Sequence, residues 1–198
     1  MTSANMPLHL TSVGSAPTEA DCVARRIADG DPAAIGEVYD AHGAAIRAFA
    51  RRLLGEDSAA EDLVHDVFVA LPKAASRFRG ESSLRTFLFS IAVNHARHHV
   101  RSATRRRAAI DRLTREPAPE GSSNPERDAR RAELAELLTR ALDALPLEQR
   151  VAFVLCEVEE RTAGEAGAIT GAPEATMRTR LFHAKRKLRE LLSREGAR

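Results

Sequence analysis

The chain has 198 residues, which is enough for one large domain or two small ones. Ala, Leu, Arg and Glu are abundant, whereas there is no Trp and only one Tyr, so the composition argues against a sheet-rich fold and predicts an all-α protein. The formal net charge is only +2, from 30 basic and 28 acidic residues, so local clusters of charge are more informative than the sum.

The N-terminal residues carry no recognisable targeting signal. "MTSANMPLHLTSVGSAPTEA" lacks both a basic start and a continuous apolar stretch, and no run approaches the roughly 20 apolar residues of a membrane span. Cys22 and Cys156 match no metal-binding or redox spacing, which indicates a reducing compartment. We therefore expect a cytoplasmic protein in which residues 1–19 form a disordered tail.

Two amphipathic helices are predicted after this tail. Asp31 as N-cap and Pro32 as first helical residue begin the first helix, and Gly55 ends it. "SAAE", residues 58–61, has the pattern of a capping box for the second helix. Apolar residues then recur at three- and four-residue steps, at Ile35, Val38, Tyr39, Ile46, Phe49 and Leu53 in the first helix and at Leu63, Val67, Leu71 and Ala74 in the second.

A third helix changes from apolar to basic along its length. "RFRGESS", residues 77–83, predicts a loop around Gly80, and "RTFLFSIAVNHARHHVR", residues 85–101, follows it. Between Arg85 and Arg115 there are eight arginines and one acid, Asp111, so this segment should attract phosphate. A solvated helix end that runs into a linker is the alternative. These helices together predict an N-terminal domain over residues 20–107.

Aromatic residues near Gly80 strengthen the nucleic-acid hypothesis. Phe78, Phe87 and Phe89 lie close in sequence to Ser82 and Ser83, and single strands are held by stacking groups beside a basic track. The same phenylalanines are also compatible with an ordinary core.

A flexible linker and a second domain follow. "TREPAPEGSSNPER", residues 114–127, has linker composition, so we assign residues 108–129 to a linker and 130–198 to a second helical domain. "ELAELLTRALDAL", a break at Pro146 and "LEQRVAFVLCEVEE" predict two helices. A capping box from Thr162 to Glu165, a stop at Gly171 and a new start at Pro173 predict a helix-turn-helix.

The final helix carries a basic face opposite an apolar one. The apolar positions are Met177, Leu181, Ala184, Leu188 and Leu191, and no acid occurs between Glu174 and Glu190. Thr179, His183 and Arg186 lie on another face with arginines and lysines around them, an arrangement that suits the major groove of DNA. A solvated basic face is the alternative, but the preceding "TGAPEAT" turn favours DNA.

Catalytic and metal-binding hypotheses have weaker support. His95, His98 and His99 could place two imidazoles on one metal, yet no third ligand follows at a diagnostic spacing. Cys156 lies in an apolar segment typical of a buried side chain. We therefore expect no enzyme activity, no cofactor and no metal.

Two long ordered segments resemble the extracytoplasmic-function sigma factors of bacterial RNA polymerase. "SAAEDLVHDVFVALPKAASRFRGESSLRTFLFSIAVNHAR" resembles the second conserved region of that family, and "ALDALPLEQRVAFVLCEVEERTAGEAGAITGAPEATMRTRLFHAKRKL" resembles its fourth. The resemblance covers about residues 20–107 and 130–192, and it implies a factor that directs core polymerase to specific promoters.

The resemblance also implies roles for particular residues. Helix 58–74, with an apolar anchor ringed by acids, resembles the face that docks on the beta-prime subunit. The implied core-polymerase residues are Glu61, Asp62, Asp66 and Phe68. The implied contacts with the minus-ten element are Phe78, Arg79, Gly80, Ser82, Ser83, Arg85, Asn94, Arg97 and Arg101. The implied contacts with the minus-thirty-five element are Thr176, Arg178, Thr179, Arg180, His183, Lys185 and Arg186.

The sequence departs from the family pattern in several places. The family commonly has Arg where His183 and Lys185 stand, so contacts with the upstream element can differ here. Phe87 stands where a tryptophan is usual, and His98 where an aspartate is frequent. Gly164 and Gly167 each predict a cost of about 1 kcal/mol to the short helix.

Partners and alternatives complete the sequence-based predictions. The resemblance implies binding to the beta-prime and beta subunits of core polymerase, to promoter DNA and to an anti-sigma factor, with no membrane insertion. An ordinary dimeric helix-turn-helix repressor and a metal-dependent enzyme built on the histidines remain the alternative hypotheses.

Overall fold

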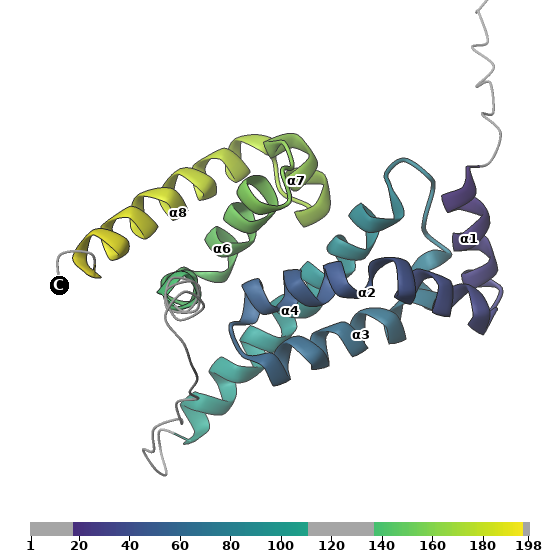
Figure 1. The fold of residues 1–198 in the computed structure, drawn as a ribbon, viewed down its shortest axis with the longest axis horizontal. Coiled ribbons are helices and arrows are strands. Elements are labelled where there is room, and N and C mark those ends of the chain that lie inside the picture. The colour runs from purple at the N-terminus through teal and green to yellow at the C-terminus, as the bar shows by residue number, and fades with distance from the viewer. Residues whose placement is uncertain (1–17, 111–136, 196–198) are drawn as a thin grey trace, which may run out of the picture.

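The computed structural model describes residues 18–110 and 137–195, and every regular element within these ranges is a helix. Figure 1 shows two groups of helices packed side by side. The N-terminal group consists of α1 (Glu19–Ala28), α2 (Pro32–Leu54), α3 (Asp57–Ala75) and α4 (Leu84–Ile110). The C-terminal group consists of helical residues 137–143, α6 (Leu147–Phe153), the π-helix η1 (Val154–Val158), α7 (Ala163–Thr170) and α8 (Glu174–Glu195).

The predicted ends of α2 are confirmed. The Asp31 side chain accepts a hydrogen bond from the amide of Ala33, and Pro32 occupies the first turn, where its missing donor costs nothing. Gly55 ends the helix with a φ of 74°, a left-handed conformation that glycine adopts without a Cβ penalty.

The predicted capping box at Ser58 is wrong. Helix α3 begins at Asp57 with Glu56 as N-cap, and no side chain caps it. Because the turn at Gly55 starts the helix earlier, Ser58 lies inside the first turn, where its hydroxyl donates to the Glu56 carboxylate at 2.7 Å. The observed start of α3 has no serine or aspartate at its N-cap, and such a residue is the signal by which a helix start is recognised in a sequence.

Helix α1 was not predicted. Thr18 is its N-cap and forms a full capping box with Asp21, so the chain becomes helical at Glu19, within the segment assigned to the tail. The carboxylate of Asp21 also lies against Gly80, where any Cβ would overlap it. Helix α1 therefore lies against the loop that precedes α4.

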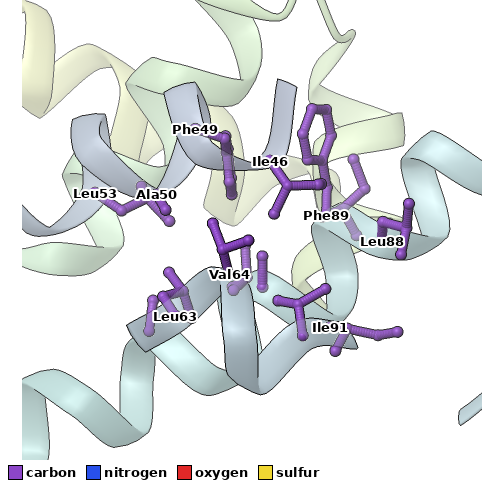
Figure 2. Packing of buried hydrophobic residues seen from close by; sticks show 14 of the residues in the cluster. Ile46, Phe49, Ala50, Leu53, Leu63, Val64, Leu88, Phe89 and Ile91 are labelled. Atoms are coloured by element: carbon purple, nitrogen blue, oxygen red, sulfur yellow. The ribbon is translucent and has the colours of Figure 1, made fainter. Parts of the chain in front are cut away.

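The core of the N-terminal group is formed by α2, α3 and α4. Figure 2 shows Phe49, Leu63 and Leu88 from these three helices pointing into one apolar interior. Phe89 is fully buried and stacks on Phe49 with 4.5 Å between ring centroids, so it is a core residue and not a platform for bases.

The predicted helix-turn-helix is confirmed. Thr162 and Glu165 form the capping box of α7, and Gly171 ends α7 in the left-handed region. Met177, Ala184 and Leu188 on α8 are buried, as the apolar stripe predicts. The predicted cost of Gly167 has a structural reason, because a Cβ there would lie 2.6 Å from the carbonyl oxygen of Ala172.

The two groups share one continuous apolar core. Val151, Leu155, Ile169 and Met177 of the C-terminal group belong to the same buried cluster as the interior of α2–α4. Helix α7 packs on α4, and α6 and η1 pack on α2. The predicted linker segment 114–127 lies outside the described residues, and α4 continues to Ile110, beyond the boundary predicted at residue 107. Within the described ranges, no helix has the length and apolarity needed to cross a bilayer.

Candidate protein and nucleic-acid interfaces

An acidic surface lies on α3, on its outward-facing turns. Glu61 and Asp62 are exposed, and Asp66 is half-buried. The Glu61 carboxylate accepts from Arg47 Nε of α2 at 2.7 Å. The Asp66 carboxylate lies 2.7 Å from His99 Nε2 and 3.7 Å from His95 Nδ1, both on α4. These contacts tie the acids to α2 and α4 and leave Asp62 open to a partner.

Apolar side chains adjoin these acids. Phe68 is half-buried and meets the ring of Tyr39 edge-on, with 4.9 Å between centroids. Val69 is 65% exposed, which is a large fraction for a β-branched apolar residue in a helix. Sequence analysis missed Val69, although its position outside the Leu63, Val67 and Leu71 stripe was a usable signal. We call Tyr39, Asp62, Asp66, Phe68 and Val69 the α3 patch.

The histidines of α4 serve the contact with α3. Because His95 and His99 both face Asp66, the cluster is explained by packing between the two helices. No group of three histidine, cysteine or acidic side chains comes together as a metal site in the described ranges. Cys156 is half-buried, and its burial raises the pKa of the thiol, which disfavours the thiolate of a nucleophile.

The loop between α3 and α4 is exposed, and contacts of Phe78 with Phe87 and of Ser83 with Thr86 hold its two ends to α4. Arg79, Ser82 and Ser83 are exposed, and Ser83 Oγ also accepts from the Thr86 amide at 3.2 Å, so this serine helps to begin α4. Gly80 has a φ of 70°. Phe78 is half-buried and meets Phe87 edge-on at 5.1 Å.

A surface hollow lies between this loop and α1. Its volume is about 520 Å³, and Phe78 and Arg79 contribute to its lining together with Asp21 and Arg25 of α1. Sequence analysis did not predict this hollow, because it depends on the undetected helix α1. An aromatic ring and a guanidinium group at one concave site are chemically suited to an unstacked base.

Two of the predicted DNA-contacting arginines on α4 are bound by carboxylates. Arg97 donates from Nε and Nη2 to the two oxygens of Glu148, at 2.8 and 3.0 Å, and from Nη1 to the carbonyl oxygen of Thr170 at 3.1 Å. Arg85 donates to Glu159 at 2.6 Å. The hydrogen bond from Arg97 is the main reason that the pKa of Glu148 lies below its ordinary value.

The other predicted residues of α4 occupy the same basic end. Asn94 is exposed, and its side-chain oxygen lies 3.3 Å from Arg97 Nη1. Arg101 donates from Nε to the carbonyl oxygen of Arg97 at 3.0 Å. The structure thus brings Asn94, Arg97 and Arg101 together, and Arg97 faces Glu148 of α6 and Thr170 of α7.

The α8 residues predicted to contact DNA divide into two groups. Arg178, Thr179, Lys185 and Arg186 are exposed, and Thr176 and His183 are half-exposed. Arg180 is half-buried and pairs with Glu148 of α6 at 2.8 Å. Neighbouring acids also engage the exposed group, through pairs of Arg178 with Glu174, Lys185 with Glu157 and Arg186 with Glu190.

Sequence analysis missed Phe182, which is 63% exposed on the same helix. Its ring lies beside His183, with 5.6 Å between centroids. An exposed aromatic ring on a basic helix can make apolar contact with a thymine methyl group. The available signal was its position, since Phe182 falls outside the apolar stripe of α8.

A buried arginine that sequence analysis also missed joins the two groups of helices. Arg150 of α6 is only 8% exposed and donates to the carbonyl oxygen of Leu53, at the end of α2, at 2.6 Å. It also donates to the Asp143 carboxylate at 2.7 Å. The same carboxylate lies against Gly55, where a Cβ would overlap it.

Comparisons with known proteins match both parts of the chain. The family model described as Sigma-70 region 2 matches residues 38–107, and that described as Sigma-70, region 4 matches residues 135–188. An ECF RNA polymerase sigma-E factor of Escherichia coli strain K12 is 32% identical over 131 residues, which are 63% of this chain and 69% of that protein. The ECF RNA polymerase sigma factor SigE of Mycolicibacterium smegmatis is 30% identical over 173 residues, 86% of this chain and 67% of that protein.

Solved structures with a similar fold are complexes. The sigma factor RpoE of Bartonella quintana, solved with the anti-sigma factor NepR, is 28% identical, with a TM-score of 0.63 over 80% of this chain and 96% of that one. CnrH, solved with the cytosolic domain of CnrY, is 26% identical, with a TM-score of 0.61 over 88% of this chain and 97% of that one.

Proposed function

Because this chain belongs to the extracytoplasmic-function sigma factors, which direct core RNA polymerase to specific promoters, we propose that it divides this work among three of its surfaces. As a sigma factor it is a transcription initiation factor whose partners are core polymerase and promoter DNA. The proposal assigns the α3 patch to polymerase, the loop 77–83 with α4 to the minus-ten element, and α8 to the minus-thirty-five element.

The single observation that supports this division is the separation of charge. Exposed acids and apolar side chains share α3, whereas exposed basic side chains gather on α8, and Arg97 and Arg101 lie together on α4. An apolar anchor among acids suits a basic helical partner. Arginines and lysines on a helix suit a groove lined by phosphates.

The assignment of the minus-ten residues follows the chemistry of a melted strand. A base that leaves the stack exposes its edge and needs a substitute for its stacking neighbours. Phe78 and Arg79 line a hollow that offers such an environment, with Gly80, Ser82 and Ser83 at its loop. Arg85, Asn94, Arg97 and Arg101 then supply the track for the backbone.

The assignment of the minus-thirty-five residues places the exposed face of α8 in the major groove. Arg178 and Thr179 are proposed to meet base edges, with His183 beside them, and Phe182 adds an apolar contact. Thr176, Lys185 and Arg186 are proposed to position the helix on phosphates.

The remaining parts of the proposal concern activity, place and regulation. We assign no catalytic chemistry to the chain, since the proposed residues bind and position. Its place of action is the cytoplasm, where bacterial polymerase works. An anti-sigma factor is a proposed partner, in line with the complexes in which the similar RpoE was solved.

Run-off transcription with purified bacterial core enzyme tests the proposal. The purified chain is expected to give start-site-specific transcripts from some members of a genomic promoter library, and core enzyme alone to give none of them. A dimeric repressor is the second candidate, and it would instead bind duplex sites tightly and specifically without core enzyme. That result, with no transcript on any promoter, would reject the sigma-factor assignment of the surfaces.

A further inference from the structure

The hollow between α1 and the loop 77–83 is built in part by a helix that lies outside the matched family region. The match to Sigma-70 region 2 begins at residue 38, whereas α1 ends at Ala28. Helix α1 nevertheless contributes four lining residues, namely Asp21, Ala24, Arg25 and Ala28. A base bound in the hollow would therefore contact a helix to which the family match assigns no role.

Small side chains leave room for a base in this hollow. Ala24 and Ala28 lie one turn apart on α1, and Ala75 is the last residue of α3. The volume of about 520 Å³ falls in the range of about 300–1,000 Å³ that is usual for small-ligand sites. The methyl groups and the ring of Phe78 offer apolar surface to the faces of a base.

The Asp21 carboxylate has one oxygen that is used inside the protein and one that is not. Oδ2 accepts from the backbone amide of Thr18 at 2.9 Å and from the Thr18 hydroxyl at 2.8 Å. Among the residues that the structure describes, none donates a hydrogen bond to Oδ1. The bond from the Thr18 hydroxyl is the main reason that the pKa of Asp21 lies below its ordinary value, so the carboxylate is charged at neutral pH.

The backbone of the loop approaches this free oxygen closely. A Cβ at Gly80 would overlap Asp21 Oδ1, so a larger residue would displace the carboxylate. Gly80 also has a φ of 70°, in the left-handed region that favours glycine. The free acceptor of α1 thus lies directly beside the loop that is assigned to the minus-ten strand.

Two cationic side chains that line the hollow are also free to bind a ligand. Arg25 and Arg79 are exposed, and within residues 18–110 and 137–195 neither forms a hydrogen bond or an ion pair. The next residue on α1, Arg26, is by contrast paired with Asp31 and Glu37. An unpaired guanidinium at the edge of the hollow suits the phosphate of a nucleotide whose base enters it.

The chemistry of Asp21 Oδ1 limits the bases that it can bind. An ionised carboxylate only accepts hydrogen bonds. Cytosine, adenine and guanine each carry an exocyclic amino group that donates, whereas thymine carries carbonyl oxygens and a methyl group instead. The single N–H on the thymine ring lies between two carbonyl oxygens, which repel a carboxylate.

We infer that Asp21 of α1 selects the base that enters the hollow, by accepting from the exocyclic amino group of cytosine, adenine or guanine and excluding thymine. Arg25 binds the phosphate of the same nucleotide. This inference rests on the proposed assignment of the loop 77–83 to the melted minus-ten strand. It makes α1 a specificity determinant of the promoter.

Asp21→Asn tests the inference because it replaces the free acceptor with a donor. The asparagine carbonyl oxygen can keep both bonds from Thr18, and the amide nitrogen then takes the place of Oδ1. An amide N–H donates to the carbonyl oxygens of thymine. Asp29→Asn is the matched control, because Asp29 caps the other end of α1, is exposed and does not line the hollow.

Selection of DNA by the assembled holoenzyme measures the base preference. The full chain is combined with core polymerase and mixed with duplexes whose non-template strand is pre-melted and randomised across the minus-ten element, and the bound DNA is sequenced. Wild type and Asp29→Asn should deplete thymine at least about tenfold at one position. Asp21→Asn should retain thymine there within about threefold of the other bases.

A change in the DNA tests the same contact on the unaltered protein. The preferred base at that position is replaced by the analogue that lacks the amino group, which is pyrimidin-2-one for cytosine, purine for adenine or hypoxanthine for guanine. Binding by the wild-type holoenzyme should weaken about tenfold, and binding by the Asp21→Asn holoenzyme by less than about threefold. Each ratio compares two DNAs on one protein preparation, so a lower folded fraction of Asp21→Asn cannot imitate the result.

Equal base preferences of wild type and Asp21→Asn would overturn the inference. Thymine retained at every position by wild type, or an analogue bound as tightly as the natural base, would overturn it as well. Run-off transcription by the same holoenzymes distinguishes this failure from failure of the proposed function, because promoter-specific transcripts show that the sigma factor works even where α1 does not select the base.

Discussion

At the scale of single residues, Arg178 is the sharpest test of how α8 recognises DNA. It is exposed on the first turns of α8 and pairs only with Glu174 among the described contacts, so it is available to a base edge. Arg178→Ala should weaken binding of a promoter duplex that contains the upstream element by about 1–3 kcal/mol. Binding to core polymerase should not change, and native gel shifts with and without core enzyme measure both. Loss of core binding instead would show that Arg178 has another role.

Arg150, in contrast, is a charged residue with a structural role inside the protein. Its guanidinium is buried and donates to the carbonyl oxygens of Leu53 and Asp143 and to the Asp143 carboxylate. Arg150→Met would leave these acceptors without their donor in a packed interface, so unfolding in urea should become easier by about 3 kcal/mol. Arg189→Met, at an exposed position of α8, is the matched control and should change stability by less than about 0.5 kcal/mol. Equal effects of the two variants would contradict the structural role of Arg150.

At the scale of elements, the turn between α7 and α8 depends on one of the two glycines in α7. A Cβ at Gly167 would lie 2.6 Å from the carbonyl oxygen of Ala172, whereas a Cβ at Gly164 would make an ordinary contact of 3.6 Å with Glu174. Gly167→Ala should therefore destabilise the protein by about 1–3 kcal/mol. Gly164→Ala should stabilise it by about 0.5 kcal/mol because alanine favours the helix. Thermal unfolding followed by circular dichroism compares the pair, and a shared sign would contradict the close approach at Gly167.

The elements also show which features the sequence could predict. Helices α2, α7 and α8 carry strong local signals, namely Asp31 with Pro32, the Thr162 capping box and the apolar stripe of α8, and these predictions are confirmed. Helix α3 begins at Asp57, and its N-cap Glu56 makes no side-chain capping bond, so the nearby serine gave a false start. The π-helix η1 could not be predicted, because no pattern of residue types in Val154–Val158 distinguishes it from an α-helix.

The candidate site divides in a similar way. The arginines on α4 and α8 could be predicted, because a cluster of charged residues can be recognised in the sequence alone. Their partners were not, because Glu148 and Glu159 lie 51 and 74 residues from Arg97 and Arg85 and only the folded chain brings them together. Val69 and Phe182 were predictable in principle, as apolar residues outside the stripes of their helices.

At the scale of the whole molecule, the stability of the folded protein should depend on pH through Glu148, whose carboxylate joins α6 to Arg97 of α4. Its pKa is lowered in the folded protein by Arg97, so its contribution to stability is fully present above the unfolded value near 4.5. That contribution is lost as the pH falls through the lower folded value. The difference in Tm between wild type and Glu148→Gln should therefore be constant from neutral pH down to the ordinary glutamate range and shrink below it. Melting curves across this series measure the difference, and a gap that widens in acid would contradict the ion pair.

The exposure of the α3 patch in the folded molecule leads to the last prediction. Val69 is 65% exposed beside the acids, so a partner that covers it gains apolar burial at little cost to the sigma factor itself. Val69→Asp should weaken binding to core polymerase at least about tenfold, since a charge would be buried in the new interface. Stability of the free protein should stay unchanged, because Val69 does not belong to the core. Val69→Thr keeps the branched shape and should stay within about threefold of wild type. Size-exclusion chromatography of mixtures with core enzyme measures the loss, and full binding by Val69→Asp would place the polymerase contact elsewhere.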